Sequence, residues 1–294
     1  MGQPEVAVVI PTFNRLASLR RCLDRLRLVS SPTFSIIVVD DGSSDGTAEC
    51  LSHSYPEVTL LLGDGNLWWA GAMNVGCRSA AATGATWVLV LNDDSEIEPD
   101  TIAALVATSR QYPDAIVGPK VLVRDLPNTI WSAGGAVRWP WPGVLMRGYY
   151  EPDHGQYDIR ADVAWLPGMG TLIRTEHFKL LGFYDAEHLP QLWGDADLTL
   201  RARKLGLKVL YEPRSRLWND TATTGMSARA ASTRDFWLTL VHPRSRLRVR
   251  STAWFYAHHC PARWLPIAYG MLYGRHAAGW AYRSFEARAR RLPS

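Results

Sequence analysis

The sequence predicts an α/β fold in which a mostly parallel sheet is flanked by helices. Short apolar runs rich in valine, isoleucine and leucine recur through the first hundred residues, at 6–10, 34–39, 58–62 and 87–91. Each run ends at a polar or glycine-containing turn, and helical patterns lie between the runs. Strands that are apolar throughout and alternate with helices are typical of a parallel sheet buried on both faces.

The helices are predicted from the spacing of their side chains. Leucines three or four positions apart indicate a helix over 15–28, and small residues rich in alanine indicate another over 70–83. In a third predicted helix, over 195–205, Asp197 and Arg201 form an i,i+4 pair of opposite charge.

The middle third of the chain, 112–192, loses this alternation and gains glycine, proline and tryptophan. We expect short antiparallel strands and loops there. After the third helix, the run 207–213 reads as a strand that is ended by its proline.

The composition is that of a globular protein. A chain of 294 residues with 47% hydrophobic and 20% charged residues can bury one large core. The 4 cysteines form no C-x-x-C pair, which argues against a disulfide framework or a zinc site and fits a reducing compartment. The opening MGQPEV lacks the features of a secretory signal, and no apolar stretch reaches the roughly 18 to 20 residues that cross a bilayer. We therefore expect a cytoplasmic protein.

The C-terminal extension, 234–294, differs from the rest of the chain. It holds eleven arginines, no lysine and only two acidic residues, interleaved with aromatic side chains. This composition is typical of an interfacial surface, and three prolines divide it into short segments. We expect helices that lie on the anionic inner face of a cytoplasmic membrane as a peripheral contact. The alternative is packing on the rest of the chain or on a second subunit, as in a homodimer; nucleic acid binding is not expected.

Four polar loops follow the predicted strands: PTFN at 11–14, DDGSSDGT at 40–47, GDGN at 63–66 and NDDS at 92–95. Ligands of parallel sheets bind beyond the carboxyl ends of the strands, so these loops should form one site. Asp40 and Asp41 would repel each other there unless a donor or a cation uses them. A carboxylate in this position could accept a hydrogen bond from a base or from a ribose hydroxyl.

The segment GNLWWAGAMNVG, 65–76, contains no phosphate-loop motif. Its helix N-terminus, near Ala70 to Met73, could still present N–H groups to a diphosphate. Close packing would also explain its small residues, but for Asn66 and Asn74 we favour a functional role.

Asp93 and Asp94 follow an apolar strand directly. A hard cation such as Mg²⁺ or Mn²⁺ prefers oxygen ligands, usually one or two carboxylates together with substrate phosphates. The alternative is a capping box between Ser95 and Glu98 at a helix start. The two interpretations are compatible, because Ser95 can begin a helix while the two aspartates face the site.

Asp195 opens the predicted helix in WGDADLTLRARKLG, 193–206. The helix dipole would lower the pKa of this carboxyl and weaken it as a base, whereas burial beside Trp193 would raise the pKa. The sequence leaves the two effects open.

Five motifs follow one another over about residues 5–225, in the order VAVVIPTFNR, IIVVDDGSSDGT, GN…GAMNVG, WVLVLNDDSEIEPD and WGDADLTLRARKLG. This order resembles the inverting family 2 glycosyltransferases with the GT-A fold. The resemblance implies a nucleotide-sugar-binding half, 1–110, an acceptor-binding and catalytic half, 111–233, and a helical extension, 234–294. It implies transfer of a sugar from a nucleoside-diphosphate sugar to a hydroxyl of a glycan or lipid-linked acceptor, in bacterial cell-surface polysaccharide synthesis.

The resemblance also implies roles for single residues. Asp195 stands where the family has its catalytic base, and Asp94 where it has a ligand of Mg²⁺ or Mn²⁺. We expect the nucleotide sugar to be bound by Pro11, Thr12, Phe13, Asn14, Asp41, Asn66, Asn74, Asn92 and Asp93. We expect the acceptor to be bound by Gly168, Met169, Trp193 and Gly194.

Two positions depart from the family pattern. Gly194 replaces the usual glutamate before the catalytic aspartate, and LWND, 217–220, offers Asn219 or Asp220 where many relatives have a histidine near the metal. The second departure weakens any metal assignment in that region. His258 and His259 read as a surface pair of the extension.

Two other classes stay open. A sugar nucleotidyltransferase would need a glycine-rich and basic signature after its first strand, which is missing here, and a non-catalytic nucleotide-sugar-binding module would need no base. The sequence specifies neither the sugar, nor the nucleotide, nor the acceptor. A resemblance to rhamnosyltransferases favours a deoxysugar.

Overall fold

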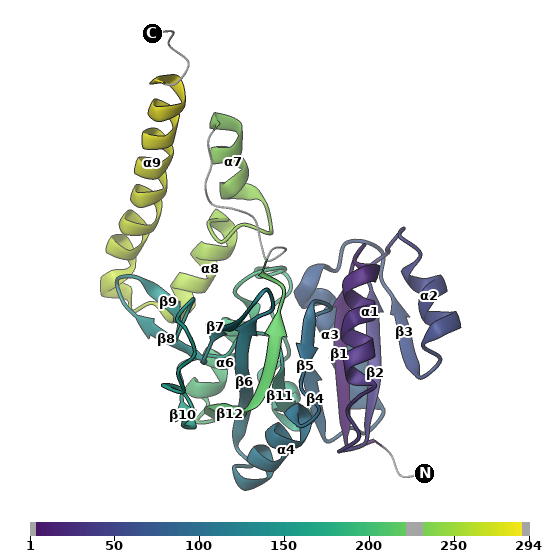
Figure 1. Cartoon of the computed structure of the whole chain (residues 1–294). Helices are drawn as coiled ribbons and strands as arrows, with labels where there is room; N and C mark the ends of the chain where they lie inside the picture. Colours follow the sequence, from purple (N-terminus) through teal and green to yellow (C-terminus); the bar gives the residue numbers. More distant parts are fainter. Residues whose placement is uncertain (1–3, 222–231, 290–294) are drawn as a thin grey trace.

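The computed structural model describes residues 4–221 and 232–289. One large sheet is built from β1 (Val6–Thr12), β2 (Phe34–Asp40), β3 (Val58–Leu62), β4 (Trp87–Val90), β5 (Ser95–Ile97), β6 (Ala115–Val123), β7 (Leu126–Ser132), β10 (Ala161–Asp162), β11 (Thr171–Arg174) and β12 (Lys208–Asn219). The strand order is β10-β12-β6-β11-β4-β1-β2-β3, with β5 added to β12 and β7 to β6 (Figure 1). β8 (Gly135–Arg138) and β9 (Gly143–Met146) form a separate hairpin.

Helices cover both faces of the sheet. They are α1 (Leu16–Leu26), α2 (Thr47–Ser54), α3 (Trp68–Ala82), α4 (Thr101–Gln111), α5 (Thr175–Leu181) and α6 (Gly194–Lys204). The core cluster on one face takes side chains from α1, α2 and α4, and that on the other face from α3, α5 and α6. The predicted α/β fold is thereby confirmed.

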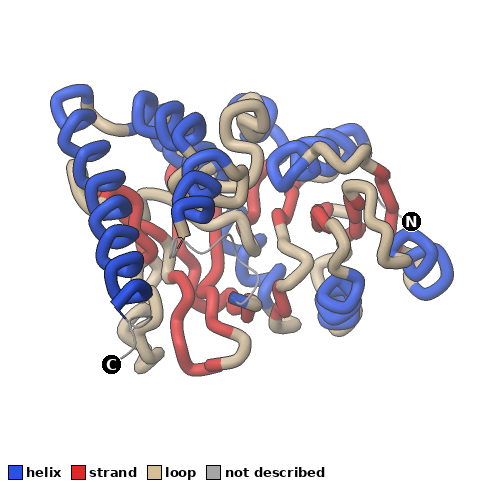
Figure 2. The backbone as a smooth tube through the Cα atoms, turned by 90° about the horizontal axis from the view of Figure 1, so that it is seen from above, coloured by secondary structure: helices blue, strands red, loops and turns tan. Residues whose placement is uncertain are grey.

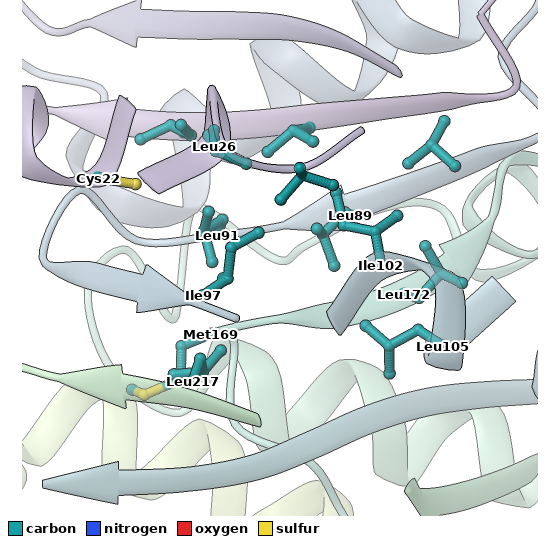
Figure 3. Packing of buried hydrophobic residues seen from close by; sticks show 14 of the residues in the cluster. Cys22, Leu26, Leu89, Leu91, Ile97, Ile102, Leu105, Met169, Leu172 and Leu217 are labelled. Atoms are coloured by element: carbon teal, nitrogen blue, oxygen red, sulfur yellow. The ribbon is translucent and has the colours of Figure 1, made fainter. Parts of the chain in front are cut away.

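The first half of the sheet is parallel, as its apolar strands predict. β1 pairs in parallel with β2 and β4, and β2 with β3. All seven residues of β1 are buried, and each large apolar side chain buried in this way stabilises the fold by about 1.5–3 kcal/mol. Figure 3 shows one of the core clusters, in which Leu89 lies beside Ile102 and Leu91 beside Ile97. This packing fixes the strand ends where the polar loops begin.

The second half joins the first through antiparallel pairing. β11 runs antiparallel to β4 and touches β6, while β6 and β12 are parallel. The two predicted halves, 1–110 and 111–233, thus share one sheet. The boundaries that we assigned to them stay predictions.

Two local predictions are wrong. Ser95 does not begin a helix, because it lies in β5 and pairs with Asn219 of β12, and the next helix begins only at Thr101. The strand predicted over 207–213 does not end at Pro213 but continues to Asn219. A register shift between Glu212 and Arg216 accommodates the proline, whose missing N–H would otherwise interrupt the ladder.

The C-terminal extension is helical, as predicted, with α7 (Thr233–Val241), α8 (Val249–His259), the short helix η2 (Ala262–Trp264) and α9 (Leu265–Ala289). In both views α9 lies at the end of the molecule away from the N-terminus (Figures 1 and 2). α7 packs on α9 through Phe236, which stacks on His276. α8 packs on α6 and on the β8–β9 hairpin. No helix in the described parts of the chain is both long and apolar enough to span a membrane.

Candidate active site

Asp93 and Asp94 lie just beyond the end of β4, where both are buried and bound to Arg15. Arg15 Nη1 is 3.1 Å from Asp93 Oδ1, and Arg15 Nη2 is 2.8 Å from Asp94 Oδ2. Thr12, at the end of the neighbouring strand β1, donates its hydroxyl to Asp93 Oδ2 at 2.8 Å. Two adjacent strand ends and the start of α1 therefore build one charged cluster.

Burial raises the pKa of Asp93 to about 7, and the neighbouring Asp94 carboxylate acts in the same direction. Arg15, Thr12 and Arg244 oppose this shift by stabilising the charged form. Arg244 belongs to the connection between α7 and α8, so the charge of the C-terminal extension acts on the carboxylates at the sheet edge.

The end of β12 lies beside the same cluster. The backbone N–H of Asp220 donates to the carbonyl of Asp94 at 3.2 Å, and its carboxylate pairs with Arg124 at 2.9 Å. Asn219 is fully buried and accepts from Ser95. Over residues 4–221 and 232–289, no three His, Cys, Asp or Glu side chains are grouped so that they could hold a metal ion. Oxygen ligands at Asp93 and Asp94 suit a hard divalent cation, but Arg15 already binds both.

Asp41 caps helix α3. Its Oδ1 accepts from the N–H of Gly65 at 2.9 Å, and its Oδ2 from those of Leu67 and Trp68 at 3.0 and 3.1 Å. The next N–H groups also have protein acceptors, Gln191 Oε1 for Trp69 and the Pro190 carbonyl for Ala70. The helix N-terminus that we expected to face a diphosphate is therefore occupied by the protein itself.

The PTFN loop lies between the acidic cluster and the turn after β2. Pro11 is buried within β1, whereas Phe13 is exposed. Asn14 has a left-handed backbone, with φ of 52°, and its side chain accepts from the N–H of Ser44 at 2.8 Å. Phe13 thus has a free face beside the site, and Asn14 fixes the loop.

The asparagines predicted to bind the donor have different partners. Asn74 is buried and exchanges two hydrogen bonds with the backbone of Tyr184, at 2.8 and 2.9 Å. Asn92 accepts from the indole N–H of Trp69 at 2.9 Å. Asn66 is exposed, and its contacts are with Asp64. Asn74 holds α3 to the second half of the protein, while Asn66 and Asn92 lie at the sheet edge.

Asp195 lies in the first turn of α6, and two backbone N–H groups hold its carboxylate. Gly168 donates to Oδ2 at 3.0 Å and Ala196 to Oδ1 at 2.8 Å. Burial nevertheless raises the pKa of Asp195, because it outweighs these two hydrogen bonds. Of the two effects that the sequence left open, burial dominates, and a higher pKa makes a stronger base.

Gly168 lies between the Trp69 ring and Asp195. A Cβ atom at this position would lie 2.5 Å from the Trp69 ring and 3.4 Å from Asp195 Cβ. The absence of a side chain therefore lets Trp69, which bonds Asn92, lie against the loop that holds Asp195. One aromatic ring connects the end of β4 with the predicted base.

The other residues predicted to bind the acceptor are divided between site and core. Trp193, just before α6, has a left-handed backbone with φ of 72° and packs on Phe255 of α8. Gly194 is buried at the start of α6. Met169 is buried in the cluster of Figure 3 near Leu217, so its burial does not support acceptor contact.

The prediction of a surface histidine pair is wrong for one member. His258 is exposed, but the side chain of His259 is 2% exposed and its Nε2 is 2.8 Å from Asp197 Oδ1. The other oxygen of Asp197 pairs with Arg201 at 2.8 Å, as the sequence predicted. Burial alone would raise the pKa of Asp197, but the hydrogen bond from His259 and the charge of Arg201 lower it. The helix that carries Asp195 is thereby fastened to the C-terminal extension.

Three arginines of this region were not predicted from the sequence: Arg15, Arg244 and Arg246. Arg15 could have been predicted, because it follows the PTFN loop directly and the carboxylates expected at the sheet edge need a cation. Arg244 and Arg246 gave no local signal, because only the fold of the extension brings them to the site.

The fold is that of a GT-A transferase, with carboxylates at the strand ends and a buried carboxylate, Asp195, at the start of a following helix. The model of the family described as Glycosyl transferase family 2 matches residues 7–163, and the chain belongs to this family. The protein is thus a glycosyltransferase.

Curated relatives have related activities. N-acetylglucosaminyl-diphospho-decaprenol L-rhamnosyltransferase of Mycobacterium tuberculosis is 29% identical over 228 residues, which are 70% of this chain and 73% of that protein. A PGL/p-HBAD biosynthesis glycosyltransferase of Mycobacterium bovis is 35% identical over 141 residues, which are 46% of this chain and 53% of that protein.

Solved structures show the same fold at low identity. GalNAc-T7 with UDP, GalNAc and Mn²⁺ has a TM-score of 0.60 and 16% identity, and the match covers 86% of this chain and 54% of that chain. The mannosyltransferase PcManGT from Pyrobaculum calidifontis, in complex with GDP-Man and Mn²⁺, has a TM-score of 0.57 and 19% identity. This match covers 98% of this chain and 81% of that chain.

Proposed function

We propose that this chain is an inverting glycosyltransferase that moves a sugar from a nucleoside-diphosphate sugar to a hydroxyl of a glycan or lipid-linked acceptor, in the synthesis of a bacterial cell-surface polysaccharide or glycolipid. Membership of the family and the mycobacterial relatives support this proposal. The relative that transfers L-rhamnose makes a deoxyhexose the first donor to test.

The observation that carries the proposal is the buried Asp195 carboxylate, held by Gly168 and Ala196 next to the ring of Trp69. Asp195 accepts the proton of the acceptor hydroxyl while that oxygen forms a bond to the anomeric carbon. The bond from this carbon to the diphosphate oxygen breaks on the opposite side, and the nucleoside diphosphate leaves. One displacement inverts the anomeric configuration, and a general base of this kind contributes roughly 10²- to 10⁴-fold.

Asp93, Asp94 and Asn92 would bind the donor at the end of β4, with Thr12 and Phe13 beside them. Asp94 would hold Mg²⁺ or Mn²⁺, which neutralises the charge of the leaving diphosphate when bound. The oxygen-only side chains fit such an ion, and Mn²⁺ is present in two similar solved structures. Because Arg15 binds both carboxylates, it would have to share or release Asp94 when the ion enters.

The proposal is tested by incubating the enzyme with a panel of sugar nucleotides and measuring nucleoside diphosphate release and the anomeric configuration of the product. Release with inversion is expected for one donor. Formation of a sugar nucleotide from a nucleoside triphosphate would identify a nucleotidyltransferase instead. Binding of the donor with no release would identify a non-catalytic module.

The metal assignment has a test of its own. Asp94→Ala should abolish turnover without unfolding the protein, and a chelator should inhibit the wild type until Mg²⁺ or Mn²⁺ is added. Full activity in excess chelator would contradict the assignment.

The extension would also place the enzyme on a membrane. Most of its exposed large apolar side chains lie on α7 and α9, and one lies on α8: Trp237, Leu238, Val241, Val249, Ile267, Met271, Tyr282 and Phe285. Basic residues near anionic lipid contribute about 1 kcal/mol each. The full chain should sediment with anionic but not with neutral vesicles, less so in high salt, and truncation at about residue 233 should remove this binding. If the intact protein ignores anionic vesicles at low salt, the membrane contact is wrong.

A further inference from the structure

The segment 242–248, HPRSRLR, connects α7 to α8 and contacts both sides of the candidate active site. The His242 ring lies edge-on to Trp68 at the start of α3, with ring centroids 6.2 Å apart. Arg244 stabilises the charged form of Asp93. The Arg246 guanidinium lies over the ring of Trp193, 5.8 Å from its centroid.

The backbone of this segment is held in place by hydrogen bonds. Ser245 and Leu247 are buried, and the N–H of Leu247 donates to Ser245 Oγ at 3.1 Å. Tyr273 of α9 donates its hydroxyl to the Leu247 carbonyl at 3.2 Å. Arg244 and Arg246 alternate with the two buried residues, and both are exposed. The segment therefore presents its arginines outward from a fixed backbone.

Within residues 4–221 and 232–289, Arg244 and Arg246 form no ion pair with a carboxylate. Arg246 instead lies among aromatic groups, and its charge lowers the pKa of Tyr149 and of Tyr256, although burial raises both pKa values overall. A guanidinium that lies over an aromatic ring keeps its N–H donors, which lie in the guanidinium plane, available to a ligand. Phosphate and carboxylate groups both match this planar set of donors.

We infer that Arg246 binds a phosphate group of the acceptor, so that the acceptor is a sugar joined to its carrier through phosphate. This inference rests on the proposed function and specifies its acceptor. Trp193 is two residues before Asp195, which places Arg246 on the side where the acceptor hydroxyl must lie. In the proposed function the donor diphosphate lies on the side of Asp93 and Asp94. The phosphate bound by Arg246 is therefore that of the acceptor and not that of the donor.

The test measures binding of farnesyl diphosphate, farnesol and inorganic pyrophosphate by titration calorimetry, with UDP and dTDP for the donor side. Arg246→Gln removes the charge and the paired donors, and Arg246→Lys keeps only the charge. Arg263→Gln is the matched control, because Arg263 is also exposed over a tryptophan ring, Trp264, at 5.6 Å. Thermal melting checks that all three variants are folded.

The wild type should bind farnesyl diphosphate, and Arg246→Gln should weaken this binding by about 10- to 100-fold, as expected for lost hydrogen bonds to a charged group. Arg246→Lys should be intermediate, Arg263→Gln should stay within about two-fold of wild type, and farnesol binding should not respond to Arg246. Pyrophosphate should bind more weakly than farnesyl diphosphate, since it lacks the lipid chain.

Three results would overturn the inference. These are no binding of farnesyl diphosphate to the wild type, equal binding to Arg246→Gln, or an equal loss of UDP or dTDP binding in Arg246→Gln, which would place Arg246 on the donor phosphates. Failure of the proposed function is distinguishable: a chain that binds farnesyl diphosphate through Arg246 but releases no nucleoside diphosphate from any donor contradicts the glycosyltransfer and not the phosphate site.

Discussion

The end of β4 and the segment 242–248 lie at the same site, but their charged side chains differ in burial and in ion pairing. At the end of β4, Asp93 and Asp94 are buried and already bound to Arg15 and Thr12. In the segment 242–248, Arg244 and Arg246 are exposed and pair with no carboxylate of the described residues. In the first region Arg15 already binds both carboxylates, so a ligand there must replace protein contacts. In the second region the two guanidinium groups form no ion pair with a described residue, so an anion can bind them without replacing one.

The largest effect is expected at Asp195, the predicted base. Asp195→Asn preserves size and can keep only one of the two hydrogen bonds from Gly168 and Ala196, and its amide cannot accept a proton, so sugar transfer should fall by about 10² or more. Donor affinity should change little. A collapse of donor binding would instead show that Asp195 supports the donor side, and the base would then lie elsewhere.

The same residue predicts the pH dependence of transfer. The base works only when it is deprotonated, and burial raises the pKa of Asp195, so kcat/KM should rise with pH through a value above the ordinary aspartate pKa of about 3.9. A profile that is flat from pH 5 upward would contradict the raised pKa.

Substitution of Arg15 tests the first region, at the end of β4. Arg15→Gln leaves two buried carboxylates without their cation, which should lower the free energy of unfolding by about 2 kcal/mol, less than for a fully buried pair because Arg15 is partly exposed. Mg²⁺ should then raise the melting temperature of this variant more than that of the wild type.

Arg25→Gln is the control for Arg15→Gln. It removes a cation from the same helix, but its partner Glu96 and Arg25 itself form a more exposed pair, so the loss should stay below about 1 kcal/mol. Equal losses in the two variants would show that Arg15 is no more than a surface charge.

His259 gives the smallest expected effect and tests how the extension acts on catalysis. His259→Ala removes the contact with Asp197, which leaves the pair with Arg201, and should cost about 1 kcal/mol of stability. Because α6 carries both Asp197 and Asp195, kcat should fall several-fold while the donor KM stays the same. His259→Gln can still donate to Asp197 and should restore kcat; an unrestored kcat would argue against a positioning role.

Much of the fold was predictable because its signals are local. β1 to β4 are continuous apolar runs, and their observed ends lie within two residues of the predicted ones. β5 was not predicted because three residues are too few to show the alternation of apolar and polar side chains in a strand. Ser95 is also as suitable for a helix cap as for a strand. The extension of β12 past Pro213 depends on a register shift that only the neighbouring strand reveals.

The site was predictable in its carboxylates but not in their partners. Asp93, Asp94 and Asp195 stand out because acids follow an apolar strand or open a helix. The partners of Asp41 are backbone N–H groups 24 to 27 residues away, and those of Asn74 lie in another helix connection. Only tertiary structure shows that such side chains are already satisfied.

The cap that Asp41 places on α3 has a consequence for protein engineering. Three N–H groups between Gly65 and Trp68 converge on one carboxylate, so the number of residues between β3 and α3 is fixed by the reach of a single side chain. A loop transplanted here from another family member should be tolerated only if it has the same length. Recombination of donor specificities should therefore exchange this loop together with β2 and the Asp41 that follows it.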